Sequence, residues 1–312
     1  RARRALRQMK SDSERLLSGQ GELDGLAVAR ALVNRLQDAD DSMMDAYFEH
    51  LATALDPDPA AVLRAAQAFA ADPQPDTLQA LQSAAEPPRQ ELLRRLNRAP
   101  GGTTAILRLR RRLLRRLPER PALRSIEGDL HLLQGRGCFA GVQRMQRVNW
   151  DSPARLLEKL IQHEAVHSID GWDDLRRRLR PDRRCFAFFH PQLPDEPLIF
   201  VEVALLPAMP AAIAPLIDKA STPLPPERFR VATFYSISNC EPGLRGVSLG
   251  NFLIKGVAEQ LQRELPELRS FCTLSPIPGL AAWLQRGPDF AALVPARRGQ
   301  AAALEAAHAL LL

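Results

Sequence analysis

The sequence predicts an α+β fold class, with an N-terminal all-helical bundle domain over residues 1–140 and a mixed-sheet domain over residues 141–312. Three observations support this prediction. Helix-favouring Ala, Leu and Arg dominate the chain, and apolar residues before residue 135 recur at helical spacing. Around residues 135–151, glycines and a β-like segment interrupt this pattern. Beyond that point, short β-prone apolar segments are separated by turn residues, and one of them leads into an amphipathic helix.

Bulk composition limits the class of protein. Of the 312 residues, 46% are hydrophobic, which is enough for a sizeable core. The net charge of +6 is compatible with nucleic acid, a membrane surface or an anionic small ligand. The arginines gather at residues 110–116 and 176–184 among leucines at helical spacing, so we interpret them as solvated helix faces. No nucleic-acid-binding motif accompanies them and no apolar stretch reaches transmembrane length, so we expect neither nucleic acid nor a membrane as a partner.

The spacing of the cysteines and the first ten residues indicate the cellular compartment of the protein. Cys138, Cys185, Cys240 and Cys272 are dispersed without a CxxC pair, which indicates neither a zinc ribbon nor a disulfide framework and fits a reducing cytoplasm. The opening RARRALRQMK is arginine-rich and amphipathic, like a transit peptide. Acidic residues follow it closely, so an ordinary helix is the better interpretation. Because no methionine precedes it, we expect the natural N-terminus to lie upstream.

The first domain is predicted to consist of short helices joined by tight turns, because prolines punctuate it at residues 57–59, 73–75 and 87–88. Two apolar stripes mark helices: Leu26, Ala29, Val33 and Leu36 form one, and Met44, Tyr47, Phe48, Leu51 and Leu55 form the other. No cluster of chemical groups occurs here. We therefore expect a scaffold that mediates self-association into a dimer or tetramer.

In the second domain the predicted elements follow one another without a repeat. Helices are expected from residue 153 and over residues 172–179. Strands at residues 185–190 and 198–206 should pair antiparallel across a short turn. A proline-rich connector over residues 207–228 leads, with one helical turn, to a strand at residues 230–237. A loop, a helix over residues 251–265 ended by Pro266, and a strand at residues 269–274 complete the order.

An H-E-x-x-H string, residues 163–167, falls on the first of these helices. On a helix, His163 and His167 would share a face and could bind zinc with Glu164 as general base. A third ligand is not apparent, since Asp170 stands where a metzincin has glycine, and a turn there should end the helix soon after His167. We favour a structural role for His167 and Glu164 in the domain interior and expect no metal.

The strand, loop and helix over residues 230–265 form a candidate anion site. The first N–H groups of a helix lack internal partners and carry partial positive charge. Arg245 adds a full charge, and Gly246 and Gly250 allow close approach of the backbone. A phosphate or pyrophosphate is the natural ligand; an ordinary strand–helix turn is the alternative. The candidate binding residues are Arg245, Gly246, Val247, Ser248, Leu249, Gly250 and Asn251.

These residues resemble known families. The segment RGVSLG, residues 245–250, is similar to the acyl-CoA pyrophosphate loop of GNAT-type N-acetyltransferases, with Ser248 in place of that loop's first glycine. The longer strings FYSISNCEPGLRGVSLGNFLIK, QRELPELRSFCTLSPIPG and EAVHSIDGWDDLRRRL resemble malonyl-CoA decarboxylases of bacterial type, closely over residues 148–284 and loosely elsewhere.

The resemblance implies a GNAT-like fold and the decarboxylation of malonyl-CoA to acetyl-CoA and CO2 through a thioester enolate, without a metal or organic cofactor. It also implies that Ser275, in the string SPIPG, is the catalytic serine. From the residues alone, Pro276 biases Ser275 toward an extended backbone at a turn, which is more typical of a structural serine than of a catalytic one.

One part of the family pattern does not match. The acid–base histidine of the family lies in an HLxNGA-like string downstream of the serine, and this sequence has no such string. His308, the only histidine after Ser275, has a different context, so we name no catalytic histidine and expect that the C-terminal part of the domain is missing here. An acyl-CoA-dependent acyltransferase of the same fold and a non-catalytic acyl-CoA sensor are the alternative functions.

Overall fold

The computed structural model describes residues 2–18, 22–135, 144–247, 250–287, 289 and 298–311. The chain divides into two compact units, Arg1–Cys272 and Thr273–Leu312, and each is described by itself. The first unit contains the helical region followed by the sheet, and two helices are described in the second. The prediction of an α+β protein with helices first and a mixed sheet after them is confirmed.

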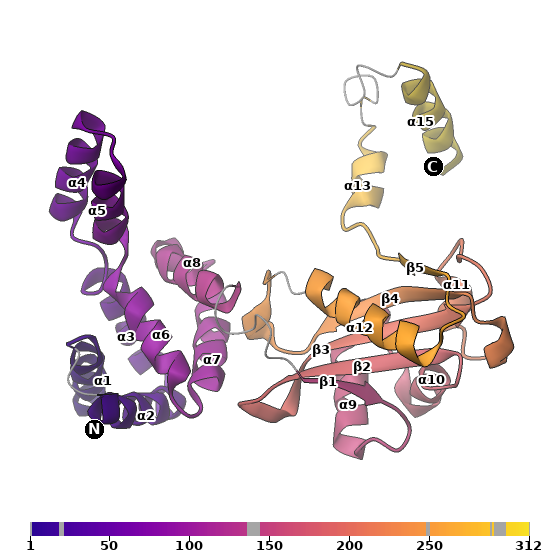
Figure 1. The fold of residues 1–312 in the computed structure, drawn as a ribbon, viewed down its shortest axis with the longest axis horizontal. Coiled ribbons are helices and arrows are strands. Elements are labelled where there is room, and N and C mark those ends of the chain that lie inside the picture. Colours follow the sequence, from indigo (N-terminus) through magenta and orange to yellow (C-terminus); the bar gives the residue numbers. More distant parts are fainter. Residues whose placement is uncertain are drawn as a thin grey trace. The chain divides into compact units, whose positions relative to one another are not determined.

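The helical region is a succession of short helices, as the prolines predict (Figure 1). They are α1 Ala2–Leu17, α2 Glu22–Asp38, α3 Asp41–Thr53, α4 Pro59–Ala71, α5 Pro75–Ala85, α6 Pro88–Arg98, α7 Gly102–Leu114, the 3-10 turn η1 Pro121–Leu123 and α8 Arg124–Leu133. The helices α4, α5 and α6 and the 3-10 turn η1 have proline in their first turn, where the missing N–H costs no hydrogen bond.

The core of this region is formed by apolar stripes of α1, α2, α3, α6, α7 and α8. The predicted stripe around Tyr47 and Phe48 is fully buried, whereas Leu26 of the other stripe is exposed. The first helix is an ordinary core helix: Met9 is buried, and Asp12 accepts a hydrogen bond from Arg35 at 2.7 Å. The arginine-rich opening therefore forms an ordinary helix, as expected from the sequence.

Helices α4 and α5 form a hairpin that packs on itself (Figure 1). Neither helix has a buried residue, and the Leu63 and Leu78 side chains are 59% and 40% exposed. The hairpin therefore contributes no residue to the apolar core of the helical region.

The sheet has the strand order β1-β2-β3-β4-β5. Its strands are β1 Arg144–Val148, β2 Arg183–His190, β3 Leu193–Leu206, β4 Val231–Asn239 and β5 Ser270–Thr273. The first four pair antiparallel. Strand β5 lies beside β4 and is reached through helix α12, Gly250–Glu264, which is the crossover that a parallel neighbour requires.

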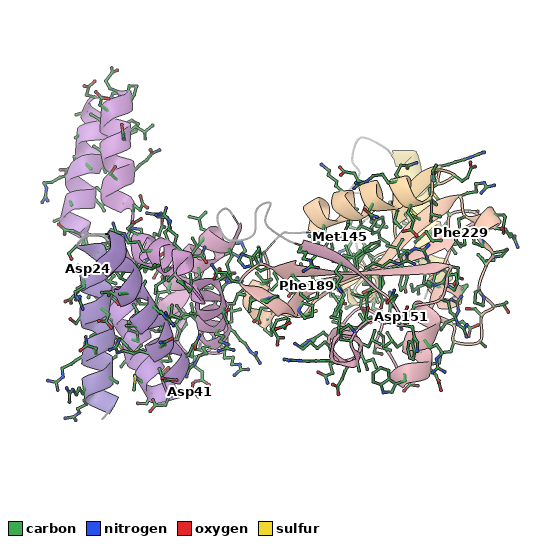
Figure 2. All side chains as sticks on the ribbon, turned by 60° about the horizontal axis from the view of Figure 1, so that its bottom comes forward. Asp24, Asp41, Met145, Asp151, Phe189 and Phe229 are labelled. Carbon is green, nitrogen blue, oxygen red and sulfur yellow. The ribbon has the colours of Figure 1, made fainter. Side chains whose placement is uncertain are left out.

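Helices cover both faces of this sheet (Figure 1). On one face, Leu253, Val257 and Leu261 of α12 pack against alternate residues of β2, β3 and β4. On the other face lie α9 Ala154–His163 and α10 Gly171–Arg178, which pack against the intervening residues of the same strands. Figure 2 shows side chains crowded around the sheet and labels Phe229, which belongs to the same apolar cluster as the residues of α12.

Most predicted elements of the sheet domain match the observed ones within two or three residues. Strand β3 is one exception, because it begins at Leu193 rather than near residue 198, so the hairpin turn is tighter than predicted. Short helical turns occupy the connector at α11 Ala214–Ile217 and η3 Pro226–Arg228. The domain boundary near residue 140 stays a prediction.

The second unit contains α13 Leu280–Gln285 and α15 Arg298–Leu311. Within it, His308 Nε2 lies 2.7 Å from the carbonyl oxygen of Leu284. Over the described part of the whole chain, no helix combines the length and hydropathy needed to cross a bilayer.

Candidate functional site

The loop after β4 has a defined conformation that suits close approach of a ligand. A 3-10 turn, η4 Pro242–Leu244, follows the strand, and the Glu241 carboxylate accepts a hydrogen bond from the Gly243 N–H at 2.9 Å. Leu244 is buried, while the Arg245 side chain is exposed. Gly246 has φ of +80°, a conformation that side-chain-bearing residues rarely adopt.

Beyond the loop, α12 begins at Gly250, so the predicted strand–loop–helix arrangement is confirmed. Ser248 and Leu249 lie outside the described residues, and of Gly250 and Asn251 only the helical backbone is described. The helix start at Gly250 supplies the unpartnered N–H groups on which the anion-site prediction rests. The anion-binding role itself stays a prediction.

Arg110 of α7 lies beneath this loop, and its sequence pattern did not single it out. Its side chain is 1% exposed, so the interpretation of residues 110–116 as a solvated face is wrong at this position. Its guanidinium donates to the carbonyl oxygens of Gly243 at 2.7 Å and Arg245 at 2.8 Å. One sequence signal points to its burial: Arg110 lies between positions of the apolar stripe that includes Ile106, Leu109 and Leu113.

The second arginine run, residues 176–184, is also largely buried rather than solvated. Arg177 pairs with Asp182, and Arg178 pairs with Asp174 and Glu202. Arg183 pairs with Asp182, and Arg184 with Glu264. An arginine at helical spacing gives the same sequence pattern whether it is buried or exposed. Here each of these guanidinium groups pairs with a carboxylate of a neighbouring or distant element, which compensates for the hydration lost on burial.

The H-E-x-x-H string does not form one helical face. Helix α9 ends at His163, and Glu164 has an extended backbone, so the prediction that the helix extends to His167 and stops soon after it is wrong. Buried Glu164 accepts hydrogen bonds from the Ser236 hydroxyl at 2.7 Å and the Ser238 hydroxyl at 2.9 Å. It also accepts from the His167 backbone N–H at 2.9 Å. Glu164 therefore ties this segment to β4, as the structural interpretation predicted.

The described residues contain no group of three or more His, Cys, Asp or Glu side chains arranged to hold a metal ion. Beside Glu164 lies instead a buried charged pair, Glu202 of β3 and Arg178 of α10. Burial, with the neighbouring Glu164 charge, raises the pKa of Glu202 to about 7.

A bulge in β4 opposite Glu202 explains how the polar side chains converge. Glu202 pairs with Ser236 and Val203 with Phe234, so Tyr235 is the extra residue. Its ring lies 6.4 Å from that of His167 by centroid, while Ser236 contacts Glu164. Two consecutive residues therefore face the α9–α10 side. Burial raises the pKa of Tyr235 above its ordinary value, so its hydroxyl stays protonated.

Ser275 follows β5 as predicted, at the start of the second unit, and its side chain is exposed. Gly279, with φ of +78°, forms the N-cap of α13 and completes the turn that the prolines predicted. The binding loop belongs to the first unit and Ser275 to the second, so their meeting in one site stays a prediction.

Comparison with protein families gives matches over both parts of the chain. The family described as malonyl-CoA decarboxylase N-terminal domain matches residues 55–135. The family described as malonyl-CoA decarboxylase C-terminal domain matches residues 141–309.

Individual relatives agree. The mitochondrial malonyl-CoA decarboxylase of Mus musculus is 38% identical over 210 residues, which is 65% of this chain and 43% of the mouse protein. That of Anser anser anser is 37% identical over 204 residues, 64% of this chain and 40% of the goose protein. The chain thus spans less than half the length of these curated relatives.

Solved structures are similar over most of the chain. The malonyl-CoA decarboxylase of Rhodopseudomonas palustris is 48% identical, with a TM-score of 0.75 over 90% of this chain and 69% of that one. The enzyme of Agrobacterium vitis is 46% identical, with a TM-score of 0.78 over the same shares of the two chains.

Proposed function

Because this chain belongs to the malonyl-CoA decarboxylase family, we propose that the protein is a carboxy-lyase that converts malonyl-CoA to acetyl-CoA and CO2. The single observation that supports this most strongly is the family match over both the helical region and the sheet domain. It agrees with a structural similarity that extends over 90% of the chain at 48% identity.

The chemistry follows from the substrate. Malonyl-CoA carries a carboxylate β to a thioester carbonyl, so loss of CO2 leaves an electron pair that the thioester accepts as an enolate. The protein must hold the carboxylate out of the thioester plane, donate hydrogen bonds to the enolate oxygen and deliver a proton to carbon. Since the thioester is itself the electron sink, the reaction calls for neither a metal ion nor an organic cofactor.

The loop after β4 is proposed to hold the CoA pyrophosphate. Arg245 supplies an exposed guanidinium, and the loop turns at Gly246 with positive φ. The helix start at Gly250 adds the partial charge of its free N–H groups. Val247, Ser248, Leu249 and Asn251 complete the proposed binding segment.

Ser275 is proposed to hydrogen-bond the reacting acyl group or to orient the acid–base histidine. Its exposure and its turn between β5 and α13 leave the hydroxyl accessible to a ligand. No histidine of this sequence is assigned the acid–base role.

The helical region, residues 1–140, is proposed to mediate self-association into a dimer or tetramer, with the α4–α5 hairpin as the contact surface. The exposed Leu63 and Leu78 support this choice. We also propose that the protein acts in the cytoplasm, on malonyl-CoA rather than on nucleic acid or a membrane.

A turnover assay tests the proposed function. Purified protein is mixed with malonyl-CoA, and acetyl-CoA and CO2 are measured with and without a chelator. We expect equal amounts of both products, unaffected by the chelator. Loss of turnover on chelation would contradict the metal-free chemistry. Transfer of the malonyl group to an added amine without release of CO2 would favour the acyltransferase.

A further inference from the structure

We propose that Arg110 of α7 is a positioning residue of the CoA site: it fixes the Arg245–Gly246 peptide so that the Gly246 N–H points toward the pyrophosphate. This inference rests on the proposed function, because it assigns a supporting residue to the same loop. It also gives the helical region a part in ligand binding in addition to self-association.

Two hydrogen bonds from Arg110 to the loop span more than a hundred residues of sequence. Arg110 Nη1 donates to the carbonyl oxygen of Gly243 at 2.7 Å, and Nη2 donates to that of Arg245 at 2.8 Å. The Arg110 side chain is buried, and its hydrogen bond to Gly243 is buried while that to Arg245 is partly buried, so water has little access to the guanidinium. One guanidinium therefore holds two alternate peptide groups of the loop in fixed orientations.

The orientation of the second peptide determines where its N–H points. All peptide bonds of the described chain are trans, and in a trans peptide the C=O and N–H point in opposite directions. Since the Arg245 carbonyl faces Arg110, the Gly246 N–H faces away from α7. Among the described residues this N–H donates to no group, whereas those of Arg245 and Val247 donate to Pro242 and Leu244. It is therefore available to an anionic ligand.

Arg110 is itself held in place by α8 and the residue after it. Its Nη2 donates to Glu127 at 2.6 Å and lies 3.2 Å from His131 Nδ1, and its Nη1 donates to Gln134 at 3.1 Å. Glu127 supplies a carboxylate that compensates the buried positive charge. A guanidinium fixed on both sides cannot follow the loop if the loop moves, so it acts as a rigid support.

Backbone packing adds to this support. A Cβ at Gly243 would lie 2.4 Å from the Leu107 carbonyl oxygen, so η4 rests directly on the α7 backbone. Leu107 is buried within the apolar cluster of the sheet and α12, apart from the other core residues of α7. Helix α7 thus forms the floor of the proposed CoA loop.

The test compares ligands with and without the pyrophosphate. Arg110→Gln removes the guanidinium that orients both carbonyls, so the loop peptide gains freedom. We expect CoA, titrated by calorimetry, to bind roughly ten- to a hundredfold more weakly, the range for a lost charged hydrogen bond. kcat/KM for malonyl-CoA should fall similarly, while kcat/KM for S-malonyl-pantetheine, which lacks the pyrophosphate, should stay unchanged.

Matched variants separate this role from general stability. Arg115→Gln, at the exposed C-cap of the same helix, should bind CoA as wild type does. Arg110→Lys keeps the charge but cannot span both carbonyls, so it should give an intermediate loss, and it replaces Arg110→Gln if that variant does not fold. An equal fall in kcat/KM for both substrates, or unchanged CoA affinity in folded Arg110→Gln and Arg110→Lys, would overturn the inference.

The outcome also separates this inference from the proposed function. If Arg245→Ala weakens CoA binding while folded Arg110 variants do not, the loop assignment stands and the role of Arg110 fails. If wild-type protein does not bind CoA at all, the proposed function fails and this inference fails with it.

Discussion

Ser275 illustrates what a single residue contributes when its neighbourhood fixes the backbone. Pro276 biases it toward an extended backbone, the chain turns at Gly279, and the Ser275 side chain is exposed. Ser275→Ala should lower kcat for malonyl-CoA by about a hundredfold or more while leaving the Kd for CoA unchanged, because the hydroxyl would act on the acyl group and not on the nucleotide. Ser270→Ala, on the preceding strand, is the control. Wild-type kcat in Ser275→Ala would remove the serine from the mechanism.

The raised pKa of Glu202 predicts how the free energy of unfolding changes with pH. Burial raises its pKa from the ordinary 4.5 to about 7, so the folded protein holds this proton more tightly than the unfolded chain does. The contribution of Glu202 to stability is therefore full below pH 4.5 and is lost as the pH rises through about 7. Glu202→Gln cannot titrate, so its free energy of unfolding should decline less between pH 5 and 8.

Urea unfolding at both pH values measures this difference. Glu196→Gln, on the same strand and 50% exposed, is the control and should follow wild type. An identical pH dependence in Glu202→Gln and wild type would show that Glu202 is ionised throughout this range.

At the residue scale, the sequence predicted the features that depend on neighbouring residues. It did not predict the features that depend on residues distant in the chain. The loop glycines and the SPIPG turn follow from backbone rules that act over a few residues. Arg110 and Arg178 could not be assigned, because an arginine at helical spacing looks the same whether water or a distant carboxylate surrounds it. Their partners Gly243 and Glu202 are far away in sequence.

Among the elements, the contact between α7 and η4 depends on the absence of a side chain at Gly243. Gly243→Ala places a Cβ against the Leu107 carbonyl, so it should lower the free energy of unfolding by about 1–3 kcal/mol, the usual cost of overpacking. Gly256→Ala, inside α12 with open space around its Cβ, should instead raise it by roughly 0.5–1 kcal/mol. Equal stability of both variants in urea unfolding would contradict the close packing of η4 on α7.

The exposed leucines of the α4–α5 hairpin lead to a prediction about self-association. Replacing both Leu63 and Leu78 by Ser removes exposed apolar surface without opening a cavity, so each protomer should stay folded while self-association weakens. Light scattering as a function of concentration measures the mass. Met209→Ser, 63% exposed in the connector after β3, is the control. An unchanged mass in the double variant would exclude the hairpin as the contact surface.

Element boundaries in the sheet domain could be predicted because each strand is a short apolar segment between turn residues. The errors have physical causes. Strand β3 starts early because Leu193 pairs with His190 across a tight turn. Helix α9 stops at His163 because the Glu164 side chain bonds to Ser236 and Ser238 of β4, which the helical pattern alone cannot reveal.

On the scale of the whole molecule, the first compact unit joins two parts that the sequence suggests are separate. The long strings of the sheet domain carry the closer resemblance in the sequence, whereas the helical region shows mainly helical periodicity, although family models match both regions. The contacts of α7 with the loop are what join them, through Arg110, Leu107 and Gly243. Such long-range contacts have no local sequence pattern, so only the folded chain reveals them.

The central claim is decarboxylation through a thioester enolate, and the most direct measurement is turnover of malonyl-CoA in D2O with mass spectrometry of the product. The account predicts acetyl-CoA with one solvent-derived deuterium in the acetyl group for each CO2 released, because the enolate carbon takes its proton from solvent or from a group that exchanges with it. Free CoA with malonate, or an intact malonyl group on an acceptor, would contradict the account.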